Sequence, residues 1–169
     1  YATVKYDQNG NQLWVSRYNG TGNNEDKPTG ITADALNNII VTGGSIGSGS
    51  NIDFATVKYN SSGTQQWVQR YNGPGNNEDR AYAIVVDNSD NIIVTGESIG
   101  SGSNYDYSTI KYNPSGSQQW VQRYNGPAND LDEAYSLALD GSGNVYVTGY
   151  SWESGTDKDY ATIKYNSAG

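Results

Sequence analysis

The chain contains no cysteine, histidine or methionine, and it has a single phenylalanine and four prolines. Without cysteine it forms no disulfides, and without histidine it lacks the commonest general acid–base side chain. Zinc sites built from cysteine and histidine are excluded for the same reason. Its apolar runs fall far short of the roughly 18 residues that a membrane-spanning helix needs, so we expect no membrane insertion.

Basic residues are also scarce, because 10 lysines and arginines stand against 18 aspartates and glutamates, for a net charge of −8. Binding to nucleic-acid phosphates needs clustered lysine and arginine, so we expect no nucleic-acid partner. The acidic, cysteine-free chain is rich in tyrosine, asparagine, glycine and serine. This composition favours an extracellular or cell-surface location.

Hydrophobic residues make up only 34% of the chain, yet aromatic residues reach 12%, with 15 tyrosines and 4 tryptophans. Disordered chains are poor in aromatic residues, so this composition predicts a packed fold. The length of 169 residues suits one domain or a piece of a larger one.

A 53-residue repeat organises the sequence. The segment YATVKY at 1–6 returns as FATVKY at 54–59, YSTIKY at 107–112 and YATIKY at 160–165, without a gap. Residues 22–74 and 75–127 are identical at 37 of 53 aligned positions. Such a period predicts stacked copies of one structural unit.

Each unit contains four strand-like runs, which in the middle copy are residues 81–87, 91–96, 105–112 and 118–124. These runs are rich in valine, isoleucine, threonine, tyrosine and tryptophan, as β-strands favour. Residues 131–140 would suit a helix if taken alone. The repeat aligns them with residues 81–87, so we predict a strand there as well.

Four antiparallel strands in each unit of this length are typical of a β-propeller blade, although a β-solenoid and a β-sandwich stay open as alternatives. The runs AYAIVVDNSDNIIVTGES (81–98) and LALDGSGNVYVTGYS (137–151) resemble the SBBP family of β-propeller repeats. The resemblance implies an all-β chain of four-stranded blades. It implies no particular chemistry.

We interpret residues 1–169 as a single repeat array of three 53-residue repeats plus one extra strand. Residues 1–21 form the two outer strands of a first blade, 22–74 and 75–127 are full repeats, and 128–169 is a partial last repeat. Three blades are too few to close a ring. We therefore expect a fragment of a longer protein, which we favour, or completion by other subunits in a ring or filament.

The connections predict where a ligand would bind. With the strands named A to D from the inside outward, the A–B and C–D turns lie on one face and the B–C and D–A loops on the other. The B–C loop (97–104) and the D–A loop (125–132) read as the longer ones, and long polar loops often carry binding. The candidate ligand-binding residues on these loops are Asn76, Asn77, Glu78, Asp79, Tyr105, Asp130, Trp152 and Lys158.

Trp152 stands where the earlier repeats have Ile46 and Ile99, and Lys158 stands where they have Ile52 and Tyr105. An aromatic ring among asparagines and aspartates suits sugar recognition. The simpler interpretation, that Trp152 covers a neighbouring blade, is the one we favour.

The acidic residues have two interpretations. Asp26, Asp79 and Asp132 recur before strand A and could ring a cation, but aspartate also binds nearby backbone N–H groups in turns. The segment 87–91 faintly resembles a calcium loop, yet it occupies a hairpin turn. We favour the structural interpretation for both and expect no metal and no cofactor.

The outer strands carry residues that suit structural roles. We predict that Lys58, Lys111 and Lys164 on strand C, and Arg70 and Arg123 on strand D, pair across strands with Asp53, Asp106 or Asp159. We expect Trp67 and Trp120 to cover the packing between blades.

Taken together, these features favour a non-catalytic extracellular scaffold, structural or adhesive, that self-assembles by strand or blade complementation. Its partners would be further repeats or other copies of the chain. One alternative is a carbohydrate-binding module with glycan ligands. Another is a carboxylate-based glycoside-active enzyme, which we disfavour because no unit has a unique acidic pair.

Overall fold

The computed structural model describes residues 1–49, 51–155 and 157–169. These residues form antiparallel β-sheets, with no helix in the described part of the chain. The strands are β1 (Ala2–Tyr6), β2 (Gln12–Arg17), β3 (Asp26–Ala33), β4 (Ile39–Ile46), β5 (Ile52–Tyr59), β6 (Gln65–Tyr71), β7 (Asp79–Val86), β8 (Ile92–Ile99), β9 (Tyr105–Tyr112), β10 (Gln118–Tyr124), β11 (Asp132–Leu139), β12 (Val145–Trp152) and β13 (Lys158–Tyr165).

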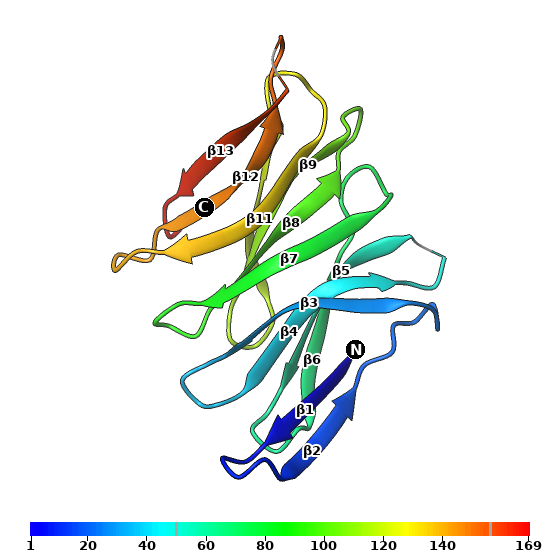
Figure 1. The fold of residues 1–169 in the computed structure, drawn as a ribbon, viewed down its shortest axis with the longest axis vertical. Helices are drawn as coiled ribbons and strands as arrows, with labels where there is room; N and C mark the ends of the chain where they lie inside the picture. Colours follow the sequence, from blue (N-terminus) through cyan, green and yellow to red (C-terminus); the bar gives the residue numbers. More distant parts are fainter. Residues whose placement is uncertain (50, 156) are drawn as a thin grey trace.

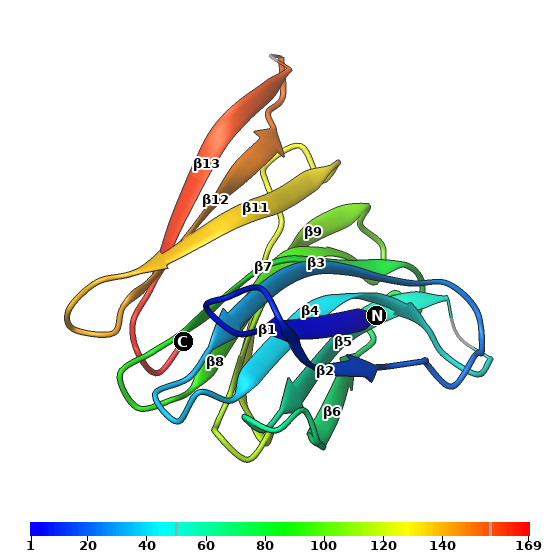
Figure 2. The same ribbon diagram turned by 60° about the horizontal axis from the view of Figure 1, so that its bottom comes forward.

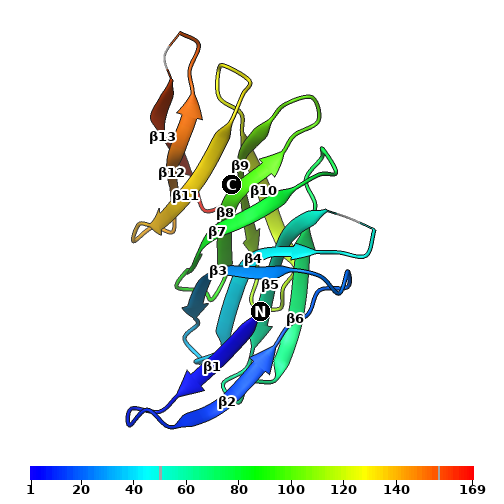
Figure 3. The same cartoon turned by 45° about the vertical axis from the view of Figure 1, so that its right-hand side comes forward.

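The strands form four sheets in chain order: β1-β2, β3-β4-β5-β6, β7-β8-β9-β10 and β11-β12-β13. Figures 1 and 2 show the sheets fanning out side by side, with β7 lying between β3 and β11. The pair β1-β2 lies at one end of the fan and β13 at the other, so the ring is not closed (Figures 1 and 3). The predicted all-β blade architecture is confirmed.

The middle strands of the complete blades are buried along nearly their whole length. Successive residues of β4 (IIVTGGSI) and β8 (IIVTGESI) are buried because a neighbouring blade covers each face of the sheet. β13 differs, since its residues alternate between exposed and partly buried. One face of the last sheet is therefore open.

The inner strands share an irregularity that sets their twist. The register of β3 against β4 shifts between Pro28 and Gly30, and β7 and β11 shift at the matching positions. Such bulges bend a strand and increase its local twist. Residues 131–140, with their helix-like pattern, form part of this series as β11, so the strand prediction is confirmed.

Tryptophans on the outer strands join consecutive blades. The Trp67 indole N–H donates to the carbonyl of Pro114, 3.1 Å away in the C–D turn of the next blade, and its ring lies 6.3 Å from that of Tyr112. Trp120 repeats the arrangement with Ser167 and Tyr165. The predicted role of both tryptophans is confirmed.

The predicted difference in loop length is wrong for the B–C connection. Strand β8 continues through Ile99, which pairs with Tyr105, so the loop is only residues 100–104. The A–B connection (87–91) and the C–D connection (113–117) have the same length. Residues 97–99 (Glu-Ser-Ile) continue the pairing of β8 with β9. The glycines and serines that predicted a loop begin only after them. Of the connections on this face, the D–A loop (125–131) is longer.

Candidate functional site

The A–B turns are held by their own aspartates. One Asp87 carboxylate oxygen accepts the backbone N–H groups of Ser89 and Asn91, each at 2.9 Å, and the Lys111 ammonium lies 3.0 Å from the other oxygen. These contacts use the oxygens that a cation would need, and Asp34 in the preceding blade is bound in the same way. The segment 87–91 is a turn.

These turns correct the predicted lysine pairs. Lys58 binds Asp34 at 2.8 Å, and both side chains are almost fully buried. Lys111 likewise binds Asp87. The lysines therefore reach across the sheet to the end of strand A. Asp53 and Asp106 lie five residues from these lysines on strand C, near its other end and on its other face.

The arginines of strand D pair as predicted. Arg123 binds Asp106 at 2.8 Å, the backbone carbonyl of Ser98 at 2.7 Å and the Tyr71 hydroxyl at 3.3 Å. Arg70 makes the matching contacts with Asp53, Ser45 and Tyr18 in the previous blade. Each arginine thus ties strands B, C and D of its blade to strand D of the preceding one.

The aspartates at the start of strand A are structural in their contacts. Asp79 is completely buried and accepts the backbone N–H of Gly73 at 2.7 Å. Asp26 and Asp132 hold Gly20 and Gly126 in the same way. Burial raises the pKa of Asp79, a cost that its hydrogen bonds offset in part. The structure places Asp79 inside the blade as the first residue of β7, and it does not project from the loop.

Other predicted site residues join the loops of neighbouring blades. Asn77 accepts a hydrogen bond from the Asn51 amide at 2.9 Å, and Asp130 accepts one from the Asn104 amide at 3.2 Å. Asn76 has positive φ (47°) and closes its own loop through Asn72. The B–C loop of one blade and the D–A loop of the next therefore lie together on one face.

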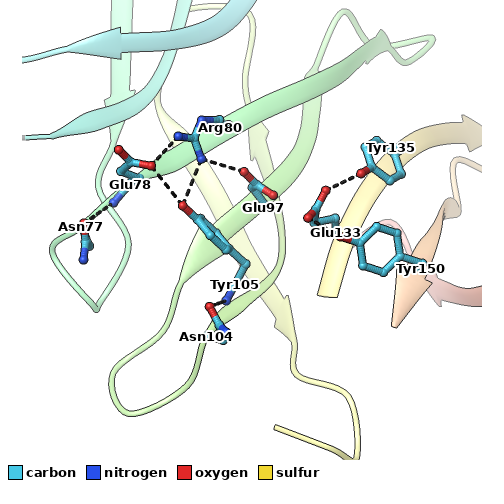
Figure 4. Close-up of polar contacts among 9 residues, drawn as sticks. All are labelled: Asn77, Glu78, Arg80, Glu97, Asn104, Tyr105, Glu133, Tyr135 and Tyr150. Atoms are coloured by element: carbon cyan, nitrogen blue, oxygen red, sulfur yellow. Dashed lines mark hydrogen bonds and ion pairs between the residues drawn. The ribbon is translucent and has the colours of Figure 1, made fainter. Parts of the chain in front are cut away.

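A polar network gathers beside these loops in the central blade. Arg80 on β7 pairs with Glu78 and, at 2.9 Å, with Glu97 on β8. The Tyr105 hydroxyl lies 3.0 Å from the Arg80 guanidinium and 3.1 Å from Glu78. Figure 4 shows these side chains pointing toward one another from β7, β8 and the start of β9. Two predicted residues, Glu78 and Tyr105, thus meet through Arg80, which the sequence analysis did not single out.

The electrostatics of this network follow from its burial. Burial raises the pKa of Glu97, and hydrogen bonds from Tyr82 and Arg80 oppose the rise. The carboxylates and hydroxyl around Arg80 raise its pKa against the effect of burial, so it stays charged. Each charge in the network has a partner of opposite sign.

The next blade repeats the arrangement with different side chains. Glu133 accepts hydrogen bonds from the hydroxyls of Tyr135 and Tyr150 (Figure 4), and partial burial together with Glu133 raises the pKa of Tyr135 to about 12. The Tyr135 ring stacks on Tyr82 of the central blade, with centroids 5.4 Å apart. The Lys158 ammonium lies 3.9 Å from the Tyr150 ring centroid, within the range of a cation–π contact.

Trp152 lies at the end of β12 and pairs in register with Lys158. It is half-buried, and its indole N–H is buried with no hydrogen-bond partner among the described residues. It lies opposite Lys158 at the end of the strand pair β12–β13.

The site residues that sequence reasoning missed are Arg80, Tyr82, Glu97, Glu133, Tyr135 and Tyr150. A signal for them was present, because the units differ at these positions. The inner strands read DKPTGITA, DRAYAIVV and DEAYSLAL, while the outer strands β6 and β10 are both QQWVQRY. The repeats therefore match closely in their outer strands and differ in sequence at the residues of the inner strands where neighbouring blades meet.

The network around Arg80 and its counterparts in the two adjoining blades form one candidate site. This site offers tyrosine rings, carboxylates and ammonium groups to a ligand. No group of three or more acidic residues in the described part of the chain is placed to hold a metal ion. Nor do the described residues contain a helix that could span a membrane.

Comparison with known families agrees with this fold. Residues 119–155 match the model of the SBBP family, described as a beta-propeller repeat. The match runs from β10 through β11 and β12, and so covers the junction of two blades. The resemblance noted in the sequence is confirmed. No curated protein matches the chain.

Proposed function

From the SBBP β-propeller repeat that the chain carries, we propose that it is a non-catalytic structural scaffold displayed outside the cell. Its incomplete last blade is completed by adding a D-type strand from a further repeat or another copy of the chain. The acidic, cysteine-free composition supports an extracellular role, and addition of such strands would support an adhesive assembly.

The open edge of β13 carries this proposal. Tyr160 is 97% exposed, while its counterpart Tyr107 is 0% exposed and packs edge-on against Tyr124 of strand D. The Ser151 hydroxyl is buried and has no hydrogen-bond partner among the described residues, whereas Ser98 at the matching position binds Arg123. The last blade therefore has a vacant place for one tyrosine and one arginine spaced as in QQWVQRY.

A synthetic peptide with the sequence of residues 117–126 tests this proposal. We expect it to bind the chain, measured by anisotropy of a fluorescent label on the peptide. A peptide with alanine at the Arg123 position should bind at least tenfold more weakly, since it leaves Ser151 without its donor. Equal binding of both peptides, or of a scrambled peptide, would refute the proposal. Sedimentation at several chain concentrations measures self-assembly directly.

The arrangement of the carboxylates supports a non-catalytic role. Glu78 and Glu97 share Arg80, and Glu133 is bound by two tyrosine hydroxyls. Glycoside hydrolysis needs one protonated and one ionised carboxyl on opposite sides of a substrate. Glu78 and Glu97 converge on one arginine and do not face each other across an open space, so the enzyme alternative is not favoured.

Carbohydrate recognition is a second candidate function, favoured by one observation. The inner ends of the blades differ between repeats, and they combine tyrosine rings with charged and hydroxyl groups. Rings that stack on the apolar face of a sugar, beside groups that bind its hydroxyls, are what such recognition requires.

A further inference from the structure

A pocket of about 270 Å³ lies between the two complete blades, on the inner side of the fold. Its walls come from Thr29, Gly44 and Ile52 of one blade and from Ala81 and Tyr82 of the next. Both blades have all four strands, so the pocket does not depend on the chain ends. Glu25, Lys27 and Arg80 also line it.

The repeat explains why this space is open. At the next junction along the chain, the Tyr82 ring stacks on Tyr135. One repeat earlier, the position of Tyr82 is held by Thr29, and Tyr82 itself stands in the position of Tyr135. The first complete blade thus lacks the tyrosine that would cover this side of Tyr82.

Two further exchanges enlarge the space. Gly44 stands where the next blade has Glu97, and Ile52 stands where it has Tyr105. Three larger side chains of the central blade are therefore replaced by smaller ones in the preceding blade. The pocket is the volume that these exchanges leave.

We propose that this pocket binds one neutral pyranose unit of a carbohydrate, an inference that deepens the second candidate function and rests on it. A sugar ring would take the place of the missing tyrosine ring, with its apolar face against Tyr82 and Ile52. The pocket volume is just below the roughly 300 Å³ at which sites for drug-sized ligands begin, which suits a single ring.

The charges around the pocket favour a neutral ligand. Glu25 and Lys27 bring one charge of each sign, and both side chains are exposed. The charge of Arg80 is already matched by Glu78 and Glu97. A carboxylate accepts from sugar hydroxyls and an ammonium donates to them, whereas a ligand with net charge would face one like charge.

The test is an NMR titration of the ¹⁵N-labelled chain with methyl glycosides of glucose, galactose and mannose. p-Cresol, a tyrosine-like ring without sugar hydroxyls, is the comparison probe. We expect at least one glycoside to shift the amides of Gly44 and Ala81, with a dissociation constant on the order of 1 mM, as is reasonable for so small a ligand.

The chain's own repeats supply the variants. Thr29→Tyr introduces the residue of the next two blades and should fill the pocket, weakening glycoside binding at least tenfold. Lys27→Glu introduces the residue found at Glu133 and should weaken binding about threefold by removing a donor. Leu36→Ser makes the same kind of exchange in an exposed turn on the opposite face and should leave binding unchanged.

The outcomes separate this inference from the broader one. Binding that survives Thr29→Tyr, with shifts near Trp152 and Lys158, overturns the pocket and leaves carbohydrate recognition standing. Binding of p-cresol without any glycoside overturns the ligand class. Absence of binding to every probe overturns both carbohydrate proposals. The scaffold proposal is then unaffected, because the peptide experiment tests it separately. If the Thr29→Tyr variant does not fold, the location of the amide shifts in the parent chain and the affinity of the Lys27→Glu variant decide whether the pocket binds the glycoside.

Discussion

The outer strands β6 and β10 have the same sequence, whereas the inner strands β3 and β7 differ at six of eight positions. Each outer strand places an arginine and a tryptophan that contact the same partners one repeat apart. At the inner ends, Thr29 and Gly44 give way to Tyr82 and Glu97. The comparison teaches that the outer strands hold blades together and that the inner ends are free to vary.

The cause lies in what each residue touches. Arg123 contacts three strands of its own blade and the preceding blade, so a change would leave several buried groups without partners. Tyr82 contacts mainly Tyr135 and Glu97. Substitutions at inner-strand positions such as Tyr82 therefore change the surface available to a ligand more than they change the stability of the blade.

The largest expected effect is at a buried ion pair that secures each A–B turn. Asp34→Asn keeps the side-chain acceptor for the turn but removes the partner of buried Lys58. We expect a loss of about 4 kcal/mol in the free energy of unfolding, measured by urea denaturation.

Asp7→Asn is the matched control for that change. Asp7 holds an exposed turn, and Asn60 does the same at the matching position of the next repeat. Its effect should stay within about 0.5 kcal/mol. A similar loss in both variants would show that the turn, and not the ion pair, carries the stability.

The second-largest loss of stability is expected from removing Arg123, whose contacts hold strands B, C and D together. Arg123→Ala leaves the buried Asp106 carboxylate without its cationic partner, and we expect a loss of about 3 kcal/mol in the same assay. Arg17→Ala removes the same residue from exposed β2 and should cost less than about 0.5 kcal/mol. Equal costs would break the distinction drawn for the outer strands.

An exchange at the inner end should be milder. Tyr82→Thr gives the central blade the residue of the preceding one and removes the stack with Tyr135, at an expected cost of about 1 kcal/mol. Its urea midpoint should therefore remain well above that of Arg123→Ala. If Tyr82→Thr lowered the free energy of unfolding as much as Arg123→Ala, the inner strand would be as constrained as the outer one.

The smallest effects concern pH, and they have opposite signs in the A–B turn and in the network around Arg80. Burial alone would raise the pKa of Asp87, but hydrogen bonds from Asn91 and the contact with Lys111 bring it below 3.8. Its stabilisation is present above that value and is lost as pH falls through the lowered pKa. The stability of the parent relative to Asp87→Asn should therefore rise between about pH 2 and pH 5.

Glu97 should behave in the opposite way. Burial raises its pKa above 4.5, so its contribution is greatest below that value and is lost as pH rises through the raised pKa. The stability of the parent relative to Glu97→Gln should fall between about pH 4 and pH 7, measured by thermal unfolding. Parallel slopes for the two variants would contradict this assignment.

Much of the fold could be predicted from the sequence because each unit constrains the others. The alignment of residues 131–140 with 81–87 settled a strand that local pattern alone would have assigned to a helix. The partners of Arg70 and Arg123 were also predicted correctly, because cross-strand neighbours follow from the order of the strands.

The candidate site was harder to predict. The length of the B–C loop was misjudged, and Asp79 proved to be a strand residue. The network around Arg80 joins three strands, and the stack of Tyr82 on Tyr135 joins two blades. Contacts of this kind depend on how far side chains reach between sheets, which no spacing in the sequence reports.

The sequence by itself determined the repeat, the four strands of each unit, their order and the residues that recur as structural contacts. It could do so because strand pairing within a blade is local and is repeated in every unit. Only the tertiary structure decided that Lys58 binds Asp34, that Tyr82 stacks on Tyr135, and that a pocket separates Thr29 from Tyr82. Those features arise where blades meet, and the angle between packed sheets fixes which side chains touch there.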